Sequence, residues 1–150
     1  MIRRFLDQRR RGVSATESAV VLPILIFIIL ATIVGGYGIF RYQQLAMLAR
    51  EGARYASVHG GMYQSDTGNA AATPQDVYNN AIVPYATLDL TQLTYSVVWN
   101  TNNMPYSVAT DYETPTNNTV TVTVSYTWMP EVFLVGPIVL SSTSTVPMSY

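Results

Sequence analysis

The longest apolar stretch of the chain is an uncharged run from Ser18 to Phe40. A helix rises about 1.5 Å per residue, so the run would extend about 35 Å. Since the hydrocarbon core of a bilayer is about 30 Å thick, the run predicts a transmembrane helix. Apolar residues keep helical spacing beyond it, and we therefore expect one long helix over residues 13–58, with its membrane part at about residues 18–40.

The part of the predicted helix that follows the membrane carries mostly small apolar residues on one face. These residues are Tyr42, Leu45, Ala46, Ala49, Ala53 and Ala56. Such a face can pack closely against a sheet or against another helix. We favour packing within the chain over a contact between subunits, and we expect Arg50, Glu51 and Arg54 to lie on a solvated face.

Helix signals continue after the long helix. Gly60 and Gly61 are expected to end it, and a polar loop is expected to run to Ala72. A short second helix should then begin at Thr73, because a threonine N-cap is followed by a proline at the first helical position and by an acid at the third. Pro84 argues against a long continuation.

Apolar and polar residues alternate in the C-terminal half, which predicts β-strands. Two clear strands span Leu93 to Trp99 and Thr119 to Trp128, and a weaker one spans about Val139 to Val146. Strands joined by loops form an antiparallel sheet, and the long helix can cover one face of it. The predicted fold class is therefore α+β, with a small domain over residues 59–150. Residues 100–118 are expected to form a long loop.

Charge is distributed unevenly around the apolar run. Five of the eight basic residues precede it, namely Arg3, Arg4, Arg9, Arg10 and Arg11. The positive-inside rule then leaves the N-terminus in the cytoplasm and the C-terminal domain outside, with Arg9, Arg10 and Arg11 as the main topology signal. No lysine or arginine follows Arg54, so the acidic outer domain is not expected to bind nucleic acid.

The composition argues against an enzyme. The chain has no cysteine and a single histidine, His59, so the usual nucleophile–base pairs and zinc ligand sets cannot be assembled. Asp111 and Glu113 are two carboxylates without the remaining ligands of a calcium site. We expect no catalytic residues, metal or cofactor, and a domain held together by packing without disulfides.

A basic segment, Gly12, and Glu17 at the fifth position after it precede an apolar helix that contains Pro23. This order resembles the class III signal of type IV prepilins. In that family a membrane aspartyl peptidase, the prepilin peptidase, cuts directly after the glycine. The resemblance implies that residues 1–12 are a basic leader, that cleavage follows Gly12, and that Val13 becomes the new N-terminus.

Glu17 is unexpected in a segment that only anchors. An ionised side chain near the centre of a bilayer costs about 2.5–3.5 kcal/mol, and less near its edge. The resemblance implies an assembly role, in which Glu17 pairs with the free amine of an adjacent subunit's first residue. As an alternative, Gly12 is a flexible joint and Glu17 is an acid favoured by the helix dipole.

A narrower resemblance covers roughly residues 11 to 57. The segments RRGVSATESAVVLPILIFIIL and LAREGARYAS are similar to the TadE-like membrane proteins of the tight-adherence (Flp, type IVb) pilus systems. That family has tyrosine after the glutamate, where this chain has Ser18. The resemblance implies a pilin-like fold and a minor pilin or pseudopilin that takes part in pilus assembly, adhesion and surface attachment.

The implied partners are the prepilin peptidase, other pilin or pseudopilin subunits through the N-terminal helix, the inner-membrane assembly platform and the lipid bilayer. The implied location is the cytoplasmic (inner) membrane, with a surface filament after processing. Two alternatives stay open: an uncleaved single-pass accessory protein of a secretion or pilus machine, and an exported protein with an atypical cleaved signal. The second rests on Arg3-Arg4-Phe5-Leu6, which is similar to part of a twin-arginine signal.

Overall fold

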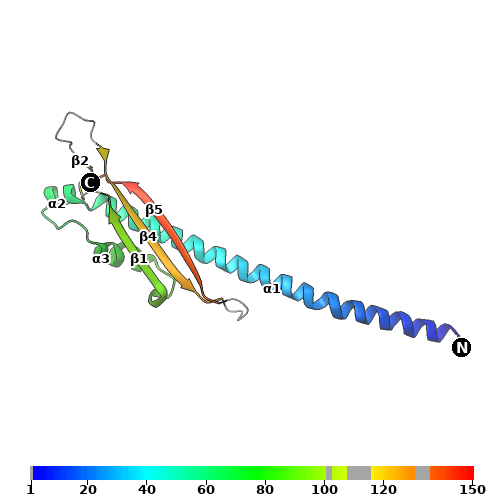
Figure 1. Cartoon of the computed structure of the whole chain (residues 1–150). Coiled ribbons are helices and arrows are strands. Elements are labelled where there is room, and N and C mark those ends of the chain that lie inside the picture. Colours follow the sequence, from blue (N-terminus) through cyan, green and yellow to red (C-terminus); the bar gives the residue numbers. More distant parts are fainter. Residues whose placement is uncertain (1, 101–102, 108–115, 131–135) are drawn as a thin grey trace. The chain divides into compact units, whose positions relative to one another are not determined.

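The computed structural model describes residues 2–100, 103–107, 116–130 and 136–150 (Figure 1). The chain forms two compact units, Met1–Gly38 and Ile39–Tyr150, and we describe each by itself. Helix α1 (Ile2–Val58) contributes to both. The fold class is α+β, as the sequence predicted, because this helix is followed by short helices and by a three-stranded antiparallel sheet.

The first unit is the N-terminal part of α1. The helix begins at Ile2 and not at residue 13, the expected start. Residues 2–11 contain no proline or glycine and are rich in arginine, which favours helix formation. The helix also continues through Pro23.

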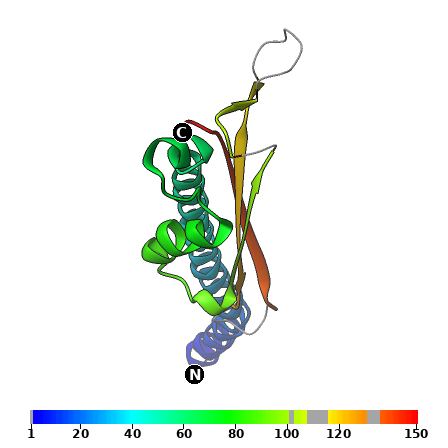
Figure 2. The ribbon, with the colours of Figure 1, turned by 90° about the vertical axis from the view of Figure 1, so that its left-hand side faces the viewer.

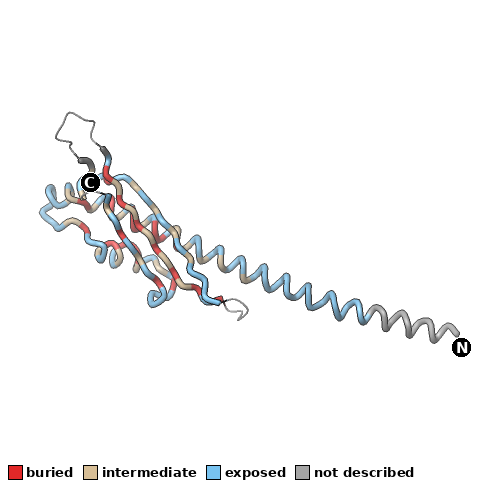
Figure 3. Tube along the Cα trace, viewed as in Figure 1, coloured by how far each residue is buried: buried red, intermediate tan, exposed pale blue. Residues whose placement is uncertain are grey.

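Apolar side chains of the first unit face outward. Val20 and Ile33 are 65% and 62% exposed, and Figure 3 shows exposed residues along the described part of this segment. Among the described residues, one helix segment, Ala15–Val58, is long and apolar enough to cross a membrane, and an 18-residue stretch within it has a mean hydropathy of 2.8. Such a surface needs a bilayer or other helices to cover it.

The second unit contains the predicted sheet. Strands β1 (Leu93–Trp99), β4 (Thr119–Trp128) and β5 (Ile138–Pro147) lie in the order β1-β4-β5, and both pairings are antiparallel. All three strands are close to the predicted bounds. In Figure 2 the sheet lies on the right. The C-terminal part of α1 and the shorter helices lie on the left and cover one face of the sheet.

The core lies between β4 and the C-terminal part of α1. Val120, Val122 and Val124 are fully buried and alternate with partly exposed hydroxyl residues. From α1 the buried hydrophobic residues are Leu45, Leu48, Ala49, Ala53 and Ala56. The expected packing within the chain is therefore confirmed for most of the small apolar face.

Two details of that face differ from the sequence interpretation. Tyr42 lies one turn before Leu45 but stays 48% exposed, so its expected place on the packed face was wrong. Gly52 was not predicted to pack, yet a Cβ built on it would lie 3.1 Å from Cγ1 of Val122. The helix approaches the sheet closely there, because a glycine has no side chain to hold it away.

The outer face of the sheet carries a ladder of hydroxyl groups. Thr121 and Thr145 bond at 2.9 Å, Thr123 and Thr143 at 3.0 Å, and Ser125 and Ser141 at 2.9 Å. Each pair stands directly opposite in the β4–β5 register. These cross-strand bonds give a partner to each of these six hydroxyls on the outer face.

Short helices precede the sheet. The predicted polar loop up to Ala72 was wrong in part, because Gly61–Thr67 forms helix α2. The predicted second helix is present as α3 (Pro74–Val77) with a capping box between Thr73 and Asp76. It continues as a π-helical turn, η1 (Tyr78–Ile82), and a 3-10 turn, η2 (Val83–Tyr85), and a further 3-10 turn, η3 (Leu90–Gln92), leads into β1.

In the segment expected to be a loop between β1 and β4, the described residues include a small hairpin. Strand β2 (Tyr106–Ser107) pairs with β3 (Thr116–Asn117). Asn118 is buried, and its amide donates to the carbonyl of Met104 at 2.8 Å. Asp111 and Glu113 lie outside the described residues, so their expected lack of a metal stays a prediction.

Candidate assembly segment

The residues predicted for processing lie inside α1. Gly12 and Val13 are helical, as are Arg9, Arg10 and Arg11. The structure describes only the backbone of these residues. A protease needs an extended backbone at the bond that it cuts, so cleavage after Gly12 requires local unwinding of the helix. Glycine in a helix interior costs about 0.5–1 kcal/mol relative to alanine, which makes this turn easier to unwind.

Glu17 lies on the exposed surface of α1. It lines a groove of about 270 Å³ together with Ser18, Val21, Leu22 and Leu25. These residues are three or four positions apart, so they share one face of the helix. None of the described side chains forms an ion pair with Glu17. An acid next to an apolar helical face is therefore available to a partner outside this chain.

The remaining part of the apolar run is shaped for close approach. Pro23 has no N–H, so the carbonyl of Ala19 loses its helical donor. A Cβ built on Gly35 or Gly36 would have no atom within 4 Å, which leaves open space beside both. Small residues of this kind let another helix approach closely in a membrane. Thr32 is already satisfied by a 2.8 Å bond to the carbonyl of Ile28.

A comparison with protein families now adds to this geometry. The family model of the TadE-like proteins matches residues 12–54. Residues 12–54 are TadE-like. The TadE-like segment begins at the predicted cleavage residue, contains Glu17 and Pro23, and ends within α1. No curated protein and no solved structure matches the chain.

The TadE-like segment has two different surroundings in the structure. Its part up to Gly38 exposes its apolar side chains, whereas its buried residues, from Leu45 on, pack under the sheet of the second unit. Sequence reasoning found Glu17 by its charge and Gly12 by its spacing, but it missed Gly52 and Leu48. Their position three to four residues from Leu45, Ala49 and Ala56 was the signal that could have found them.

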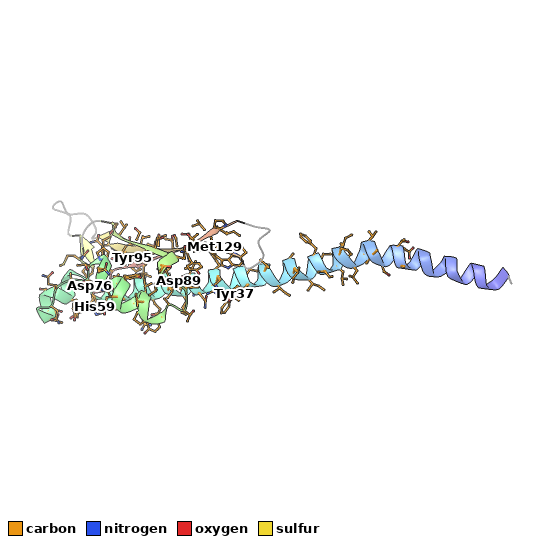
Figure 4. The ribbon with its side chains drawn as sticks, turned by 90° about the horizontal axis from the view of Figure 1, so that it is seen from below. Tyr37, His59, Asp76, Asp89, Tyr95 and Met129 are labelled. Atoms are coloured by element: carbon orange, nitrogen blue, oxygen red, sulfur yellow. The ribbon has the colours of Figure 1, made fainter. Side chains whose placement is uncertain are left out.

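A second group of polar and aromatic residues lies around the end of α1. The rings of Tyr55 and His59 stack at 4.0 Å, and Nδ1 of His59 donates to the carbonyl of Tyr55 at 2.9 Å. These two residues line a pocket of about 290 Å³ with Asp76, which Figure 4 shows near His59. The pocket brings a histidine and a carboxylate toward one another, but without an ion pair between them.

The C-terminus is tied to the same region. The amides of Ser149 and Tyr150 donate to the carbonyl of Ser57 at 3.0 and 3.1 Å. The phenol of Tyr150 donates to Asp66 at 2.6 Å, and this hydrogen bond raises the pKa of Tyr150. These contacts hold the chain end in place. Among the described residues, no group of three metal-ligating side chains is present.

Proposed function

We propose that this chain is a minor pilin or pseudopilin of a tight-adherence (type IVb) pilus, acting in pilus assembly, adhesion and surface attachment. The TadE-like match supports association with the pilus machinery. One observation carries the finer proposal: the match begins at Gly12, and the exposed Glu17 follows at the fifth position at the start of an exposed apolar helix.

The mechanism is assembly by helix packing. The apolar part of α1 anchors the chain in the inner membrane with its N-terminus in the cytoplasm. Prepilin peptidase removes residues 1–12, and Val13 gains a free amine. Glu17 of an incoming subunit pairs with that amine, which neutralises a carboxylate that is costly to hold at the membrane edge.

The other roles follow from that mechanism. The open surface at Gly35 and Gly36 receives the helix of another subunit, and the assembly platform draws the helices together. The second unit supplies the surface of the assembly. The protein has no catalytic activity of its own and needs no metal, cofactor or nucleic acid.

The N-terminus of the mature protein tests the processing step. Mass spectrometry of membrane and sheared surface fractions, from cells with and without prepilin peptidase, should show a peptidase-dependent start at Val13. Gly12→Val should block that start, because a branched side chain replaces the small residue before the cut. Gly36→Val makes the same change further along the helix and should leave cleavage intact.

Glu17→Gln tests the assembly step separately. This variant should be cleaved normally but should be depleted from the sheared fraction at least tenfold, because the amine of the partner loses its counter-charge. Glu51→Gln makes the same change in the second unit and should assemble normally. Normal assembly of Glu17→Gln would remove the pairing role from the proposal.

A second candidate function is an uncleaved membrane accessory protein of the same machinery. The helical backbone across Gly12 and Val13 favours it, because an intact helix resists a protease. A start at Met1 in both strains would establish this alternative and exclude the pilin role.

A further inference from the structure

One end of the second unit exposes apolar side chains from several segments. We call this set the apolar rim; it consists of Tyr85, Leu90, Met129, Ile138 and Val139. Met129 and Val139 are 72% and 68% exposed, the two highest values among the described large apolar residues of the second unit. An exposed apolar patch of this kind marks an interaction surface.

The strand register places the members of the rim at one end of the sheet. Trp128, the last residue of β4, pairs with Ile138, the first residue of β5. Leu93 pairs with Tyr126, so η3, which begins at Leu90 and directly precedes β1, lies at the same end. Figure 4 shows Met129 at this end of the strands.

The segment that carries Tyr85 and Leu90 is also fixed against α1. The side-chain amide of Gln44 donates to the hydroxyl of Thr87 at 2.7 Å. Thr87 lies between η2 and η3. This bond therefore holds both turns near Gln44, close to the point where α1 enters the second unit. The part of the rim that Tyr85 and Leu90 form is therefore tied to α1.

The level of the rim along α1 follows from the geometry of helix and strand. Gly52 lies next to Val122. From Val122 to Trp128 a strand advances about 20 Å, at about 3.3 Å per residue. The same length along a helix is about 13 residues, at 1.5 Å each. The rim therefore lies near Ile39, where α1 enters the second unit.

The residues of α1 at that level are apolar too. Ile39 and Phe40 are 63% and 52% exposed and are the last residues of the uncharged run. The apolar rim thus lies at the end of the second unit where the uncharged run enters it.

We infer that the apolar rim rests in the interface of the bilayer that α1 crosses, so that the domain sits on the membrane surface through Tyr85, Leu90, Met129, Ile138 and Val139. This inference rests on the membrane anchor of the proposed function. The last residues of the uncharged run, Ile39 and Phe40, belong to the second unit and lie at the level of the rim, so the bilayer that receives the run is the surface nearest to it. Lipid is therefore the partner that the geometry itself provides.

The chemistry of the rim indicates shallow contact with uncharged lipid headgroups. Interfacial elements bury an apolar face about 5–10 Å into the boundary between headgroups and acyl chains. Asp89 is exposed within the same segment, and a hydrogen bond from the backbone of Thr91 lowers its pKa, so its carboxylate is ionised and stays outside the acyl region. The five residues of the rim are uncharged, so the rim itself does not favour anionic lipids over neutral ones.

Single cysteines can test this contact, because the chain has none of its own. The full chain would be reconstituted into phosphatidylcholine vesicles after Met129→Cys or Val139→Cys and labelling with a polarity-sensitive fluorophore. Lipids with brominated acyl chains quench a label that reaches them. Val98→Cys is the matched control, since Val98 is also an exposed strand valine but lies toward the opposite end of the sheet.

Labels at positions 129 and 139 should be quenched at least twofold more than the label at position 98. Ile33→Cys, within the apolar run, distinguishes a failure of the rim inference from a failure of the membrane anchor. If position 33 is quenched but the rim positions match position 98, the rim inference is overturned and the anchor stands. If position 33 is not quenched either, the membrane anchor itself fails. The labels could instead report an apolar environment that depends on the protein-to-lipid ratio, without being quenched by the brominated lipids. That result would indicate contact with a second copy of the chain and would also overturn the inference.

Discussion

At the scale of single residues, Gly52 determines how closely the TadE-like helix packs on the sheet. Its missing side chain brings the backbone of α1 next to Val122, with Ile82 and Val77 at 3.5 Å from the position of a Cβ. All three neighbours are fully buried and cannot move into solvent. The small residue is therefore a packing requirement, in contrast to Gly36, which has open space beside it.

We predict that Gly52→Leu destabilises the second unit by about 1–3 kcal/mol, because extra atoms in a packed core force neighbours apart. Thermal unfolding of the full chain in detergent, followed by circular dichroism of the sheet, measures the effect. Gly36→Leu is the matched control and should change the stability by less than about 0.5 kcal/mol. Equal effects of the two variants would contradict the packing role of Gly52.

At the scale of elements, α3 depends on its N-terminal cap. The hydroxyl of Thr73 accepts from the amide of Asp76, and the backbone amide and hydroxyl of Thr73 donate to the Asp76 carboxylate at 2.9 and 2.6 Å. The hydrogen bonds from Thr73 lower the pKa of Asp76. A lowered folded-state pKa contributes stability above the unfolded value of about 4, and this contribution is lost as the pH falls through the folded pKa.

We predict that Thr73→Ala costs about 1 kcal/mol at neutral pH, the usual loss for an N-cap. The pKa of Asp76 should rise toward its ordinary value in this variant, and the stability difference from the parent should narrow below about pH 4. An NMR titration of Asp76 and denaturant unfolding at several pH values measure the two effects. Thr73→Ser keeps the hydroxyl, so this variant should retain both the stability of the parent and the lowered pKa of Asp76.

The elements also show what sequence reasoning can find and why it misses the rest. The bounds of β1 and β4 and the cap at Thr73 were predictable, because alternation and capping chemistry act between residues close in sequence. Helix α2 has no buried residue and thus no apolar stripe to detect. The buried Asn118 was missed for another reason: its partner, Met104, becomes a neighbour only when the small hairpin forms.

The candidate assembly segment was more predictable than the domain. Gly12, Glu17 and Pro23 stand out because a small residue, a charge and a proline are conspicuous around an apolar run. The apolar rim was not found in this way. Met129 and Val139 are ordinary apolar residues in the sequence, and only the strand register brings them level with the end of the membrane run.

At the scale of the whole molecule, the orientation across the membrane decides which partners each end can meet. Five arginines precede the apolar run, and Arg41, Arg50 and Arg54 follow it. Replacing Arg9, Arg10 and Arg11 by glutamine leaves two arginines before the run, Arg3 and Arg4, and three after it. The positive-inside bias is then reversed, since the rule counts lysine and arginine near the ends of the span.

We predict that this triple variant exposes its C-terminal domain to the cytoplasm in a substantial fraction of molecules. Protease added to spheroplasts should degrade the outer domain of the parent chain and spare that fraction in the variant. Arg50→Gln with Arg54→Gln leaves five arginines against one, and its domain should stay fully accessible. Full accessibility of the domain to protease in the triple variant would mean that Arg3 and Arg4, or the domain itself, set the orientation. Arg9, Arg10 and Arg11 would then matter for processing alone.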